Sequence, residues 1–92
     1  MKQQDIFKAL ADPTRRQILQ TLRQHSLSAG ELADHFDMTK ASMSHHFTVL
    51  KNAELVRTER RGQQIFYSLN TSVFEDVAAL MFSLFGNNSE KP

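Results

Sequence analysis

The spacing of apolar residues changes twice along this chain, and these two changes constrain the fold more than any other feature. Up to about residue 53, apolar side chains recur three or four positions apart, which is typical of amphipathic helices. From Val56 to Leu69 they alternate with other residues as in strands, and from Ser72 the helical spacing returns. The sequence therefore predicts a mostly α, α+β domain with one β-hairpin set between helices.

Three helix-start signals divide the helical first half. Asp12 before Pro13 offers a capping carboxylate and a proline that loses no helical hydrogen bond. Ser28 and Glu31 have the spacing of a capping box, and Thr39 offers a third cap. We therefore expect four helices, over about residues 1–12, 13–24, 28–37 and 40–53. About three residues separate the last two, so they form a candidate helix-turn-helix motif.

A hairpin and a fifth helix complete the predicted fold. Strands are expected over residues 56–59 and 64–69, with a turn that contains Gly62 between them. The last helix should run from about residue 72 to 85, and Gly86 is suited to end it. The order of elements is that of a winged helix-turn-helix with five helices and a two-stranded wing.

Length and composition exclude several classes of protein. Ninety-two residues allow one domain, expected over residues 1–86, with a frayed tail over 87–92. The chain has no cysteine, which excludes disulfides, thiolate metal sites and cysteine nucleophiles. The longest nearly apolar run, residues 77–85, is too short to span a bilayer, and no signal-peptide core is present. We expect a soluble, cytoplasmic protein without membrane insertion.

Charge is distributed unevenly although the net charge is only +1. Residues 1–37 hold five basic and five acidic side chains, and residues 71–92 have a balance of −2. Residues 38–70 hold five basic side chains against two carboxylates, a balance of +3. The positive field therefore lies over the second helix of the helix-turn-helix and the hairpin.

The helix over residues 40–53 has two contrasting faces. At 100° per residue, Met43, Phe47 and Leu50 share one stripe that should face the core. The other side has no large apolar residue and consists of Lys40, Ala41, Ser44, His45, Thr48, Lys51 and Asn52. Short polar side chains allow close approach to DNA and can meet base edges and phosphates in the major groove. An ordinary solvated face remains the alternative for the helix taken alone.

These motifs resemble those of the ArsR/SmtB family of bacterial repressors. The resemblance rests on the run Ala9–Arg16 followed by Ile18-Leu19, the stretch Ser42–Phe47 with Leu50 and Lys51, and the Arg61-Gly62 hairpin leading to Tyr67. The compact size and the lack of cysteine look most like the SdpR-type autorepressors of that family. The resemblance implies a homodimeric, sequence-specific repressor, whose Lys40, Ala41, Ser44 and His45 match DNA-contacting positions of the family.

Further contacts with double-stranded DNA are predicted around this helix. Ser42 is a candidate phosphate contact, and Arg60, Arg61 and Gln63 at the wing tip could reach the flanking groove or its phosphates. His46 lies beside the core stripe, so we expect packing or an internal hydrogen bond. Arg15 and Arg16 lie in the first turn of their helix, where the macrodipole disfavours cations, and a phosphate, a carboxylate or a structural ion pair would explain them.

Two copies of the chain are expected to pair through the first and last helices, whose apolar stripes exceed what one small monomer should bury. The predicted interface consists of Ile6, Phe7, Leu10, Val73, Phe74, Val77, Leu80, Met81, Leu84 and Phe85. An apolar core within one chain is the alternative. A two-fold dimer would place its recognition helices about 34 Å apart and would match an inverted-repeat operator.

Three other functions are alternatives to a DNA-binding repressor. A metal-responsive repressor of the same family lacks the necessary ligands here, because His35 and nearby carboxylates would form only a weakly specific site, so no metal or cofactor is expected. An enzyme using Ser44 and His45 is disfavoured, since neighbours on a helix diverge by 100°. A winged-helix protein-interaction module stays open. Control by protein level, a regulatory protein partner or a small molecule also stays open.

Overall fold

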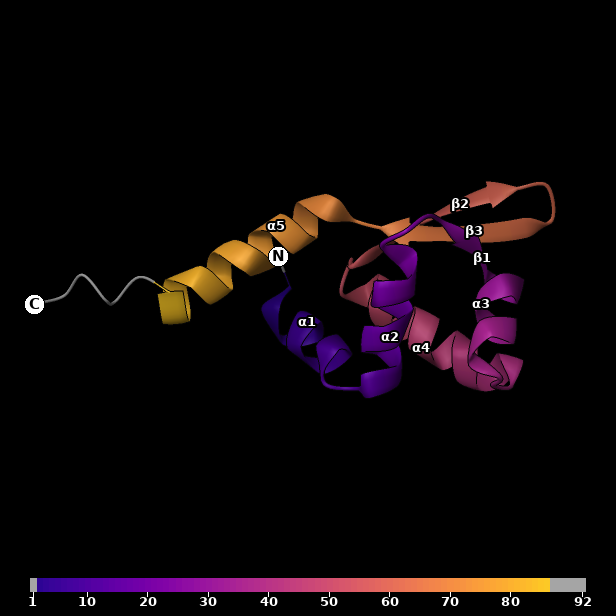
Figure 1. The fold of residues 1–92 in the computed structure, drawn as a ribbon, viewed down its shortest axis with the longest axis horizontal. Helices are drawn as coiled ribbons and strands as arrows, with labels where there is room; N and C mark the ends of the chain where they lie inside the picture. Colours follow the sequence, from indigo (N-terminus) through magenta and orange to yellow (C-terminus); the bar gives the residue numbers. More distant parts are fainter. Residues whose placement is uncertain (1, 87–92) are drawn as a thin grey trace, which may run out of the picture.

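The computed structural model describes residues 2–86, which form five α-helices, three strands and a terminal π-helical turn (Figure 1). The helices are α1 (Gln3–Leu10), α2 (Pro13–Leu22), α3 (Ala29–Phe36), α4 (Lys40–Asn52) and α5 (Thr71–Met81), followed by the turn η1 (Phe82–Gly86). The strands are β1 (Leu27–Ser28), β2 (Val56–Arg61) and β3 (Gln64–Leu69). The winged helix-turn-helix prediction is confirmed, whereas the predicted tail over residues 87–92 lies outside the described residues. No helix within residues 2–86 is long and apolar enough to cross a membrane.

The predicted caps form as the sequence indicates. The Asp12 carboxylate accepts a hydrogen bond from the Arg15 amide at 3.1 Å. Ser28 and Glu31 cap each other's amides at 3.1 and 2.9 Å, and Thr39 accepts from the Ser42 amide at 3.1 Å. These bonds satisfy amides that the first turn of each helix leaves free, so they fix where α2, α3 and α4 begin.

The wing contains one strand more than the two predicted. The sheet order is β1-β3-β2, and the two residues of β1 pair with Tyr67 and Phe66 of β3. A two-residue strand shows no alternation in sequence, and Ser28 had been interpreted only as a helix cap. The hairpin turn is also tighter than predicted, since Arg61 already pairs with Gln64. Gly62 has a φ of 63°, which glycine adopts without the steric cost that a side chain brings.

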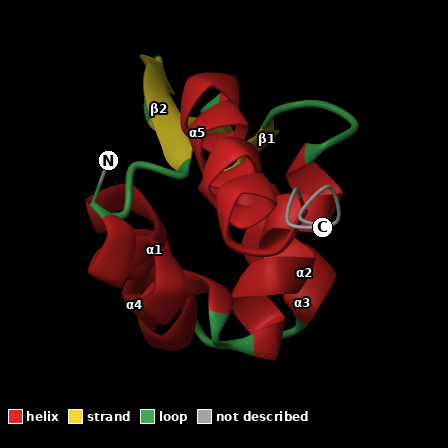
Figure 2. Cartoon of the chain, turned by 90° about the vertical axis from the view of Figure 1, so that its left-hand side faces the viewer, coloured by secondary structure: helices red, strands yellow, loops and turns green. Residues whose placement is uncertain are grey.

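The core lies between α1, α2, α3, α4 and the inner face of the sheet. Met43, Phe47 and Leu50 of α4 are buried in it, as their shared stripe predicted. Val49, which was not included in that stripe, is buried as well. The reason is that α1 lies beside α4 and covers a second side of it (Figure 2). Only the polar side of α4 is left exposed.

Helix α5 projects away from this core (Figures 1 and 2). The chain has a radius of gyration of 15.0 Å, against about 12 Å expected for a compact domain of this length. Val73 is buried, and Phe74 and Val77 pack partly against the core. Beyond them the helix continues into η1, where the Phe82 ring lies so close to Gly86 that a Cβ there would meet it at 2.5 Å.

Candidate nucleic-acid interface

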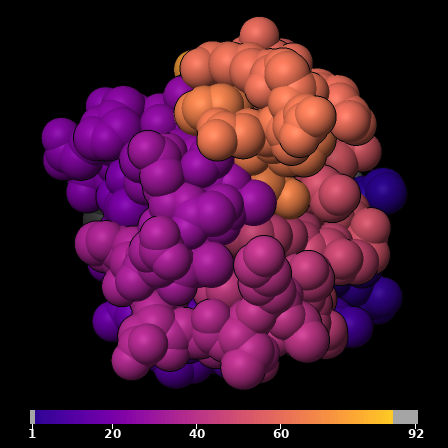
Figure 3. All heavy atoms as spheres, turned by 90° about the vertical axis from the view of Figure 1, so that its right-hand side faces the viewer, coloured from indigo at the N-terminus to yellow at the C-terminus, as the bar shows by residue number. Residues whose placement is uncertain are grey.

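The outer face of α4 is exposed along its length. Every residue predicted on this face is solvent-exposed, namely Lys40, Ala41, Ser44, His45, Thr48, Lys51 and Asn52, and Ser42 in the first turn is exposed too. Figure 3 looks onto the end of the molecule where α3, α4 and the wing form one surface. The structure therefore presents short polar and basic groups together, beside the hairpin. That these groups contact DNA stays a prediction.

Arg60 and Arg61, at the tip of the wing, lie on opposite faces of the sheet. Paired residues of an antiparallel ladder share a face, and Arg60 pairs with Ile65. Two positions along β3, Tyr67 stacks on Phe47 of α4, with ring centres 4.4 Å apart. Arg60 therefore belongs to the face that is turned toward α4, and its Nε donates to the Gly62 carbonyl at 3.2 Å.

Arg61 belongs to the outer face of the wing. Its Nη2 donates to Glu59 Oε1 at 3.0 Å, and its guanidinium lies 4.3 Å from the centre of the Phe66 ring. These contacts hold the charge against the wing itself. The sequence could not distinguish Arg60 from Arg61, because the register that separates them depends on the two-residue turn. Gln63 lies in that turn and is exposed.

His46 is turned inward, as predicted, and joins α4 to α1 and α2 through Arg15. The Arg15 Nη1 lies 3.2 Å from His46 Nδ1. The same guanidinium donates from Nε to the Ala9 carbonyl and from Nη2 to the Lys8 carbonyl, each at 2.9 Å. Arg16 donates to the Leu10 carbonyl at 2.8 Å. The two arginines thus satisfy three successive carbonyls at the end of α1.

This arrangement differs from the carboxylate or ion-pair partners expected for Arg15 and Arg16, whereas a phosphate contact stays a prediction. Their guanidinium groups bond to main-chain carbonyls of α1, and no direct bond from either to a carboxylate is found among residues 2–86. The carboxyl end of α1 carries the negative pole of its helix dipole, which compensates for the unfavourable position at the start of α2. Eight residues form a marginal helix alone, so α1 depends on these contacts.

The tautomer of His46 follows from its partner. A guanidinium only donates, so Nδ1 must accept and the ring must be neutral. Burial lowers the pKa of His46, and the charges of Arg15 and His45 lower it further against the opposing effect of Asp12. Although the Asp12 carboxylate lies 4.0 Å from Nδ1, the shorter contact with Arg15 favours the neutral form. Burial by itself raises the pKa of Asp12, but hydrogen bonds from the Arg15 and Thr14 amides and the charge of the Arg15 guanidinium lower it overall.

Comparison with known proteins decides the family. The family model described as bacterial regulatory protein, arsR family, matches residues 12–58, slightly more than half of the chain and all of α2, α3 and α4. The chain belongs to the arsR family. The matched region includes the whole helix-turn-helix motif, and ends within β2 of the wing.

Individual relatives agree with this assignment. The arsR-family chain is 50% identical to the transcriptional repressor SdpR of Bacillus subtilis over 72 residues. This aligned region covers 78% of this chain and 80% of SdpR. It is 36% identical over 72 residues to the arsenical resistance operon repressor of Staphylococcus aureus, covering 78% of this chain and 69% of the relative. A crystal structure of an ArsR family transcriptional regulator aligns with a TM-score of 0.84 and 32% identity, over 91% of this chain and 92% of that one.

Titratable side chains in this arsR-family protein do not gather as metal ligands. Within residues 2–86, no group of three or more histidine, aspartate or glutamate side chains could hold an ion. His45 and His46 have ring centres 5.7 Å apart, but His46 is engaged with Arg15 while His45 is exposed. The donor sets needed for a metal sensor are therefore not assembled in the described chain.

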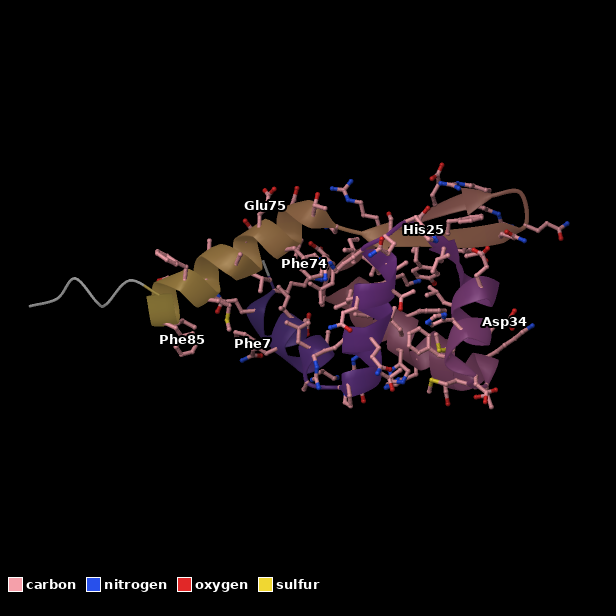
Figure 4. All side chains as sticks on the ribbon, viewed as in Figure 1. Phe7, His25, Asp34, Phe74, Glu75 and Phe85 are labelled. Carbon is pink, nitrogen blue, oxygen red and sulfur yellow. The ribbon has the colours of Figure 1, made fainter. Side chains whose placement is uncertain are left out.

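The far end of α5 exposes large apolar side chains. Those exposed are Phe7, Met81, Phe82, Leu84 and Phe85, the last two aromatics being 60% and 70% exposed. Phe7 and Phe85 point to the same side of α5, while Glu75 points to the other (Figure 4). Phe82 was not among the predicted interface residues, because it does not fit the 3.6-residue spacing of the α5 stripe.

Not every predicted interface residue is free to meet a partner. Ile6 is 1% exposed and Val73 is 8% exposed, because both pack into the chain's own core. Phe74, Val77 and Leu10 are half-buried against the same core. A dimer contact would therefore fall on the outer residues, from Leu80 to Phe85 together with Phe7.

Proposed function

We propose that this arsR-family protein is a transcriptional repressor that binds double-stranded DNA as a homodimer at an inverted-repeat operator, the operator of its own gene being the first candidate. One observation carries the proposal. The exposed side of α4 carries small, polar and basic side chains over its full length, while the other sides of the helix are buried. A surface of this kind fits the major groove, where a bulky apolar face would not. Such a role places the protein in the compartment that holds the DNA.

The exposed side chains divide into two kinds of contact. Ser44 and His45 carry groups that read base edges, and Ala41 lets the helix approach them closely. The phosphates that border the groove are bound by Lys40, Lys51 and Ser42. Thr48, further along the exposed side of α4, is a further contact with the DNA. In the wing, Arg60 and Gln63 meet the flanking backbone, and Arg61 contributes once it leaves Glu59.

Dimerisation supplies the second half of the site. The exposed apolar residues of α5 and η1, with Phe7 of α1, cover one another across a two-fold axis. Two copies of α4 about 34 Å apart would then face successive major grooves on one side of the duplex. The operator should therefore consist of two inverted half-sites about one helical turn apart.

Catalysis is not part of the proposed function. Ser44 and His45 are adjacent and exposed on α4, and no hydrogen bond joins them in the described chain. A serine nucleophile needs a base within hydrogen-bond reach and a group that orients that base. No cofactor is needed for binding DNA by these contacts.

A duplex taken from upstream of the protein's own gene provides the test. Fluorescence anisotropy should show saturable binding to that duplex and much weaker binding to a scrambled duplex of equal length. Inserting five base pairs between the half-sites turns them to opposite sides of the DNA, and should abolish two-site binding. Equal affinity for the native, scrambled and lengthened duplexes would refute a sequence-specific dimer.

The recognition helix is tested separately by single substitutions. Lys40→Ala, Ser44→Ala and His45→Ala should each weaken binding to the native duplex, by about 1 to 3 kcal/mol where the lost contact reads a base. Glu75→Gln, on the opposite side of α5 from the apolar residues, is the matched surface control and should bind as the parent does. Unchanged affinity in all three α4 variants would remove α4 from the interface.

A further inference from the structure

A hollow opens where α3, α4 and β3 meet, beside the proposed DNA surface (Figure 3). It has a volume of about 310 Å³ and is lined mainly by apolar groups. Gly30 and Ala33 form the α3 wall, and the stacked rings of Phe47 and Tyr67 form the wall opposite. The space exists because α3 presents small residues here. Its volume lies at the lower end of the range for small-molecule sites.

Three polar groups face this apolar space. Lys40 and Ser44 of α4 are solvent-exposed and lie at the rim of the hollow. Among the described residues that line the hollow, Lys40 carries the charge. Tyr67 is only 6% exposed, yet its hydroxyl has no hydrogen-bond partner among the described residues. No side-chain nitrogen or oxygen of the described chain is both fully buried and unpaired, so this hydroxyl keeps some accessible surface, and Tyr67 is one of the residues that line the hollow.

The protonation state of Tyr67 suits a donor. Burial raises the pKa of its hydroxyl, so the group stays protonated near neutral pH and can donate to an acceptor. Lys40, Ser44 and Tyr67 thus supply an ammonium group and two hydroxyls to a lining whose other residues are apolar or glycine. A complementary ligand has an aromatic body and one anionic, acceptor-rich end.

We propose that this hollow binds a small aromatic carboxylate, with its ring between the α3 wall and the Phe47–Tyr67 pair and its carboxylate at Lys40, Ser44 and Tyr67. The ring replaces water on apolar surface, and the carboxylate accepts charge-assisted hydrogen bonds. Lys40 and Ser44 also belong to the exposed side of α4. A bound carboxylate would therefore compete with DNA for them, a consequence that rests on the proposed function.

The direct test uses 2-naphthoate and the full-length protein without DNA. Amide chemical shifts in a ¹⁵N–¹H spectrum should move at Gly30, Ala33 and Ser44 as naphthoate is added, with a dissociation constant on the order of 0.1 to 1 mM for a ligand of this size. The neutral analogue 2-naphthalenemethanol should bind about tenfold more weakly, because it lacks the charge that meets Lys40.

Two variants separate the walls of the site from its charge. Gly30→Leu should weaken naphthoate binding at least about tenfold by filling the hollow, and the open space around Gly30, with its nearest neighbour 4.0 Å from a new Cβ, allows the substitution without a clash. Lys40→Gln should weaken binding of naphthoate but not of the neutral alcohol. Lys51→Gln, also exposed on α4 but not part of the lining, is the matched control and should change neither.

Several outcomes would overturn the site. They are shifts confined to the apolar end of α5, unchanged binding in both Gly30→Leu and Lys40→Gln, and equal binding of the acid and the alcohol. In a second arm, saturating naphthoate should release operator DNA from the parent protein but not from Gly30→Leu, and unchanged DNA affinity would overturn the competition. Absence of any DNA binding would refute the proposed function instead, and the direct titration would still decide whether the hollow is a ligand site.

Discussion

The exposed side of α4 and the exposed end of α5 lie at opposite ends of the molecule and have opposite chemistry (Figure 1). The α4 side carries lysine, hydroxyl and imidazole groups, which water solvates well. The α5 end carries Met81, Phe82, Leu84 and Phe85, each at least 42% exposed. Both surfaces are accessible to solvent in a single chain. Only the α4 side is well solvated, since exposing apolar surface, as the α5 end does, costs about 25 cal/mol of free energy per Å².

This difference assigns the two surfaces different kinds of partner. The α4 side is solvated in the free protein, and in the proposed complex it would exchange water for phosphates and bases. The α5 end is favoured to be covered, and the proposed second copy would bring an identical apolar surface to it. In that dimer the two regions would be coupled, because pairing through α5 would determine where the two α4 helices stand.

The strongest test of the coupling is a charge placed at the α5 end. Leu84→Glu buries an unpaired carboxylate in the proposed dimer contact, so analytical ultracentrifugation should show monomers at micromolar concentration. Operator affinity should then fall about 100- to 10,000-fold, because each half-site is bound without the help of the other. Folding should be retained, since Leu84 is 55% exposed in the single chain.

Glu75→Gln is the control for that experiment, because Glu75 points to the other side of α5 (Figure 4). It should leave both the dimer and the DNA affinity unchanged. A Leu84→Glu protein that stays dimeric, or a monomer that binds the operator as the parent does, would break the proposed coupling between the two regions.

The buried guanidinium between α1, α2 and α4 gives the next largest effect. Arg15→Ala removes three contacts at once and leaves the Ala9 carbonyl without its donor, while the Lys8 carbonyl keeps only the bond from the Ala11 amide at 3.3 Å. We expect a loss of about 2 to 4 kcal/mol in the free energy of unfolding, measured by urea denaturation. Arg16→Ala removes one exposed bond to Leu10 and should cost less than about 1 kcal/mol. Equal losses in the two variants would contradict the role given to Arg15.

The sequence predicted the α4 side better than it predicted the α5 end. Caps and helical spacing are local, so Ser28, Glu31 and Thr39 indicated the helix-turn-helix directly. The positions of Ile6 and Val73 depend on how helices pack, and spacing alone could not separate core from interface. Phe82 was missed because it lies off the 3.6-residue stripe of α5, and β1 was missed because two residues show no period.

A single hydroxyl on α4 tests whether the polar side reads sequence. Ser44→Ala should weaken operator binding by about 1 to 3 kcal/mol and relax selectivity at one base pair. Ser72→Ala, an exposed serine on α5, is the matched control and should bind normally. Selection of bound duplexes from a randomised pool would show the relaxed position. An unchanged preference would mean that Ser44 contacts only the backbone.

The wing should make a smaller contribution that does not depend on sequence. Arg60→Ala should weaken binding to all duplexes and reduce the slope of log affinity against log salt by about 1, as expected for one lost phosphate contact. Arg61→Ala should reduce the slope less, because that guanidinium must first leave Glu59 and Phe66. Equal slopes for Arg61→Ala and Arg60→Ala would show that the outer face of the wing meets DNA equally well.

The smallest expected effect is a dependence of stability on pH at the inner side of α4. The pKa of His46 is lowered in the folded chain by burial and by Arg15, so the unfolded chain binds a proton more readily. The contribution of His46 to stability is therefore complete above its ordinary pKa of about 6.5 and is lost as the pH falls through that value toward the folded pKa.

His46→Gln, whose side-chain oxygen can still accept from Arg15, should flatten the decrease in urea midpoint between about pH 7 and 5. His45→Gln, on the exposed side, removes only the smallest of the causes that lower the pKa of His46 and should flatten that decrease much less. If both variants flatten the decrease in urea midpoint equally, burial of a neutral His46 on the inner side of α4 is not its cause.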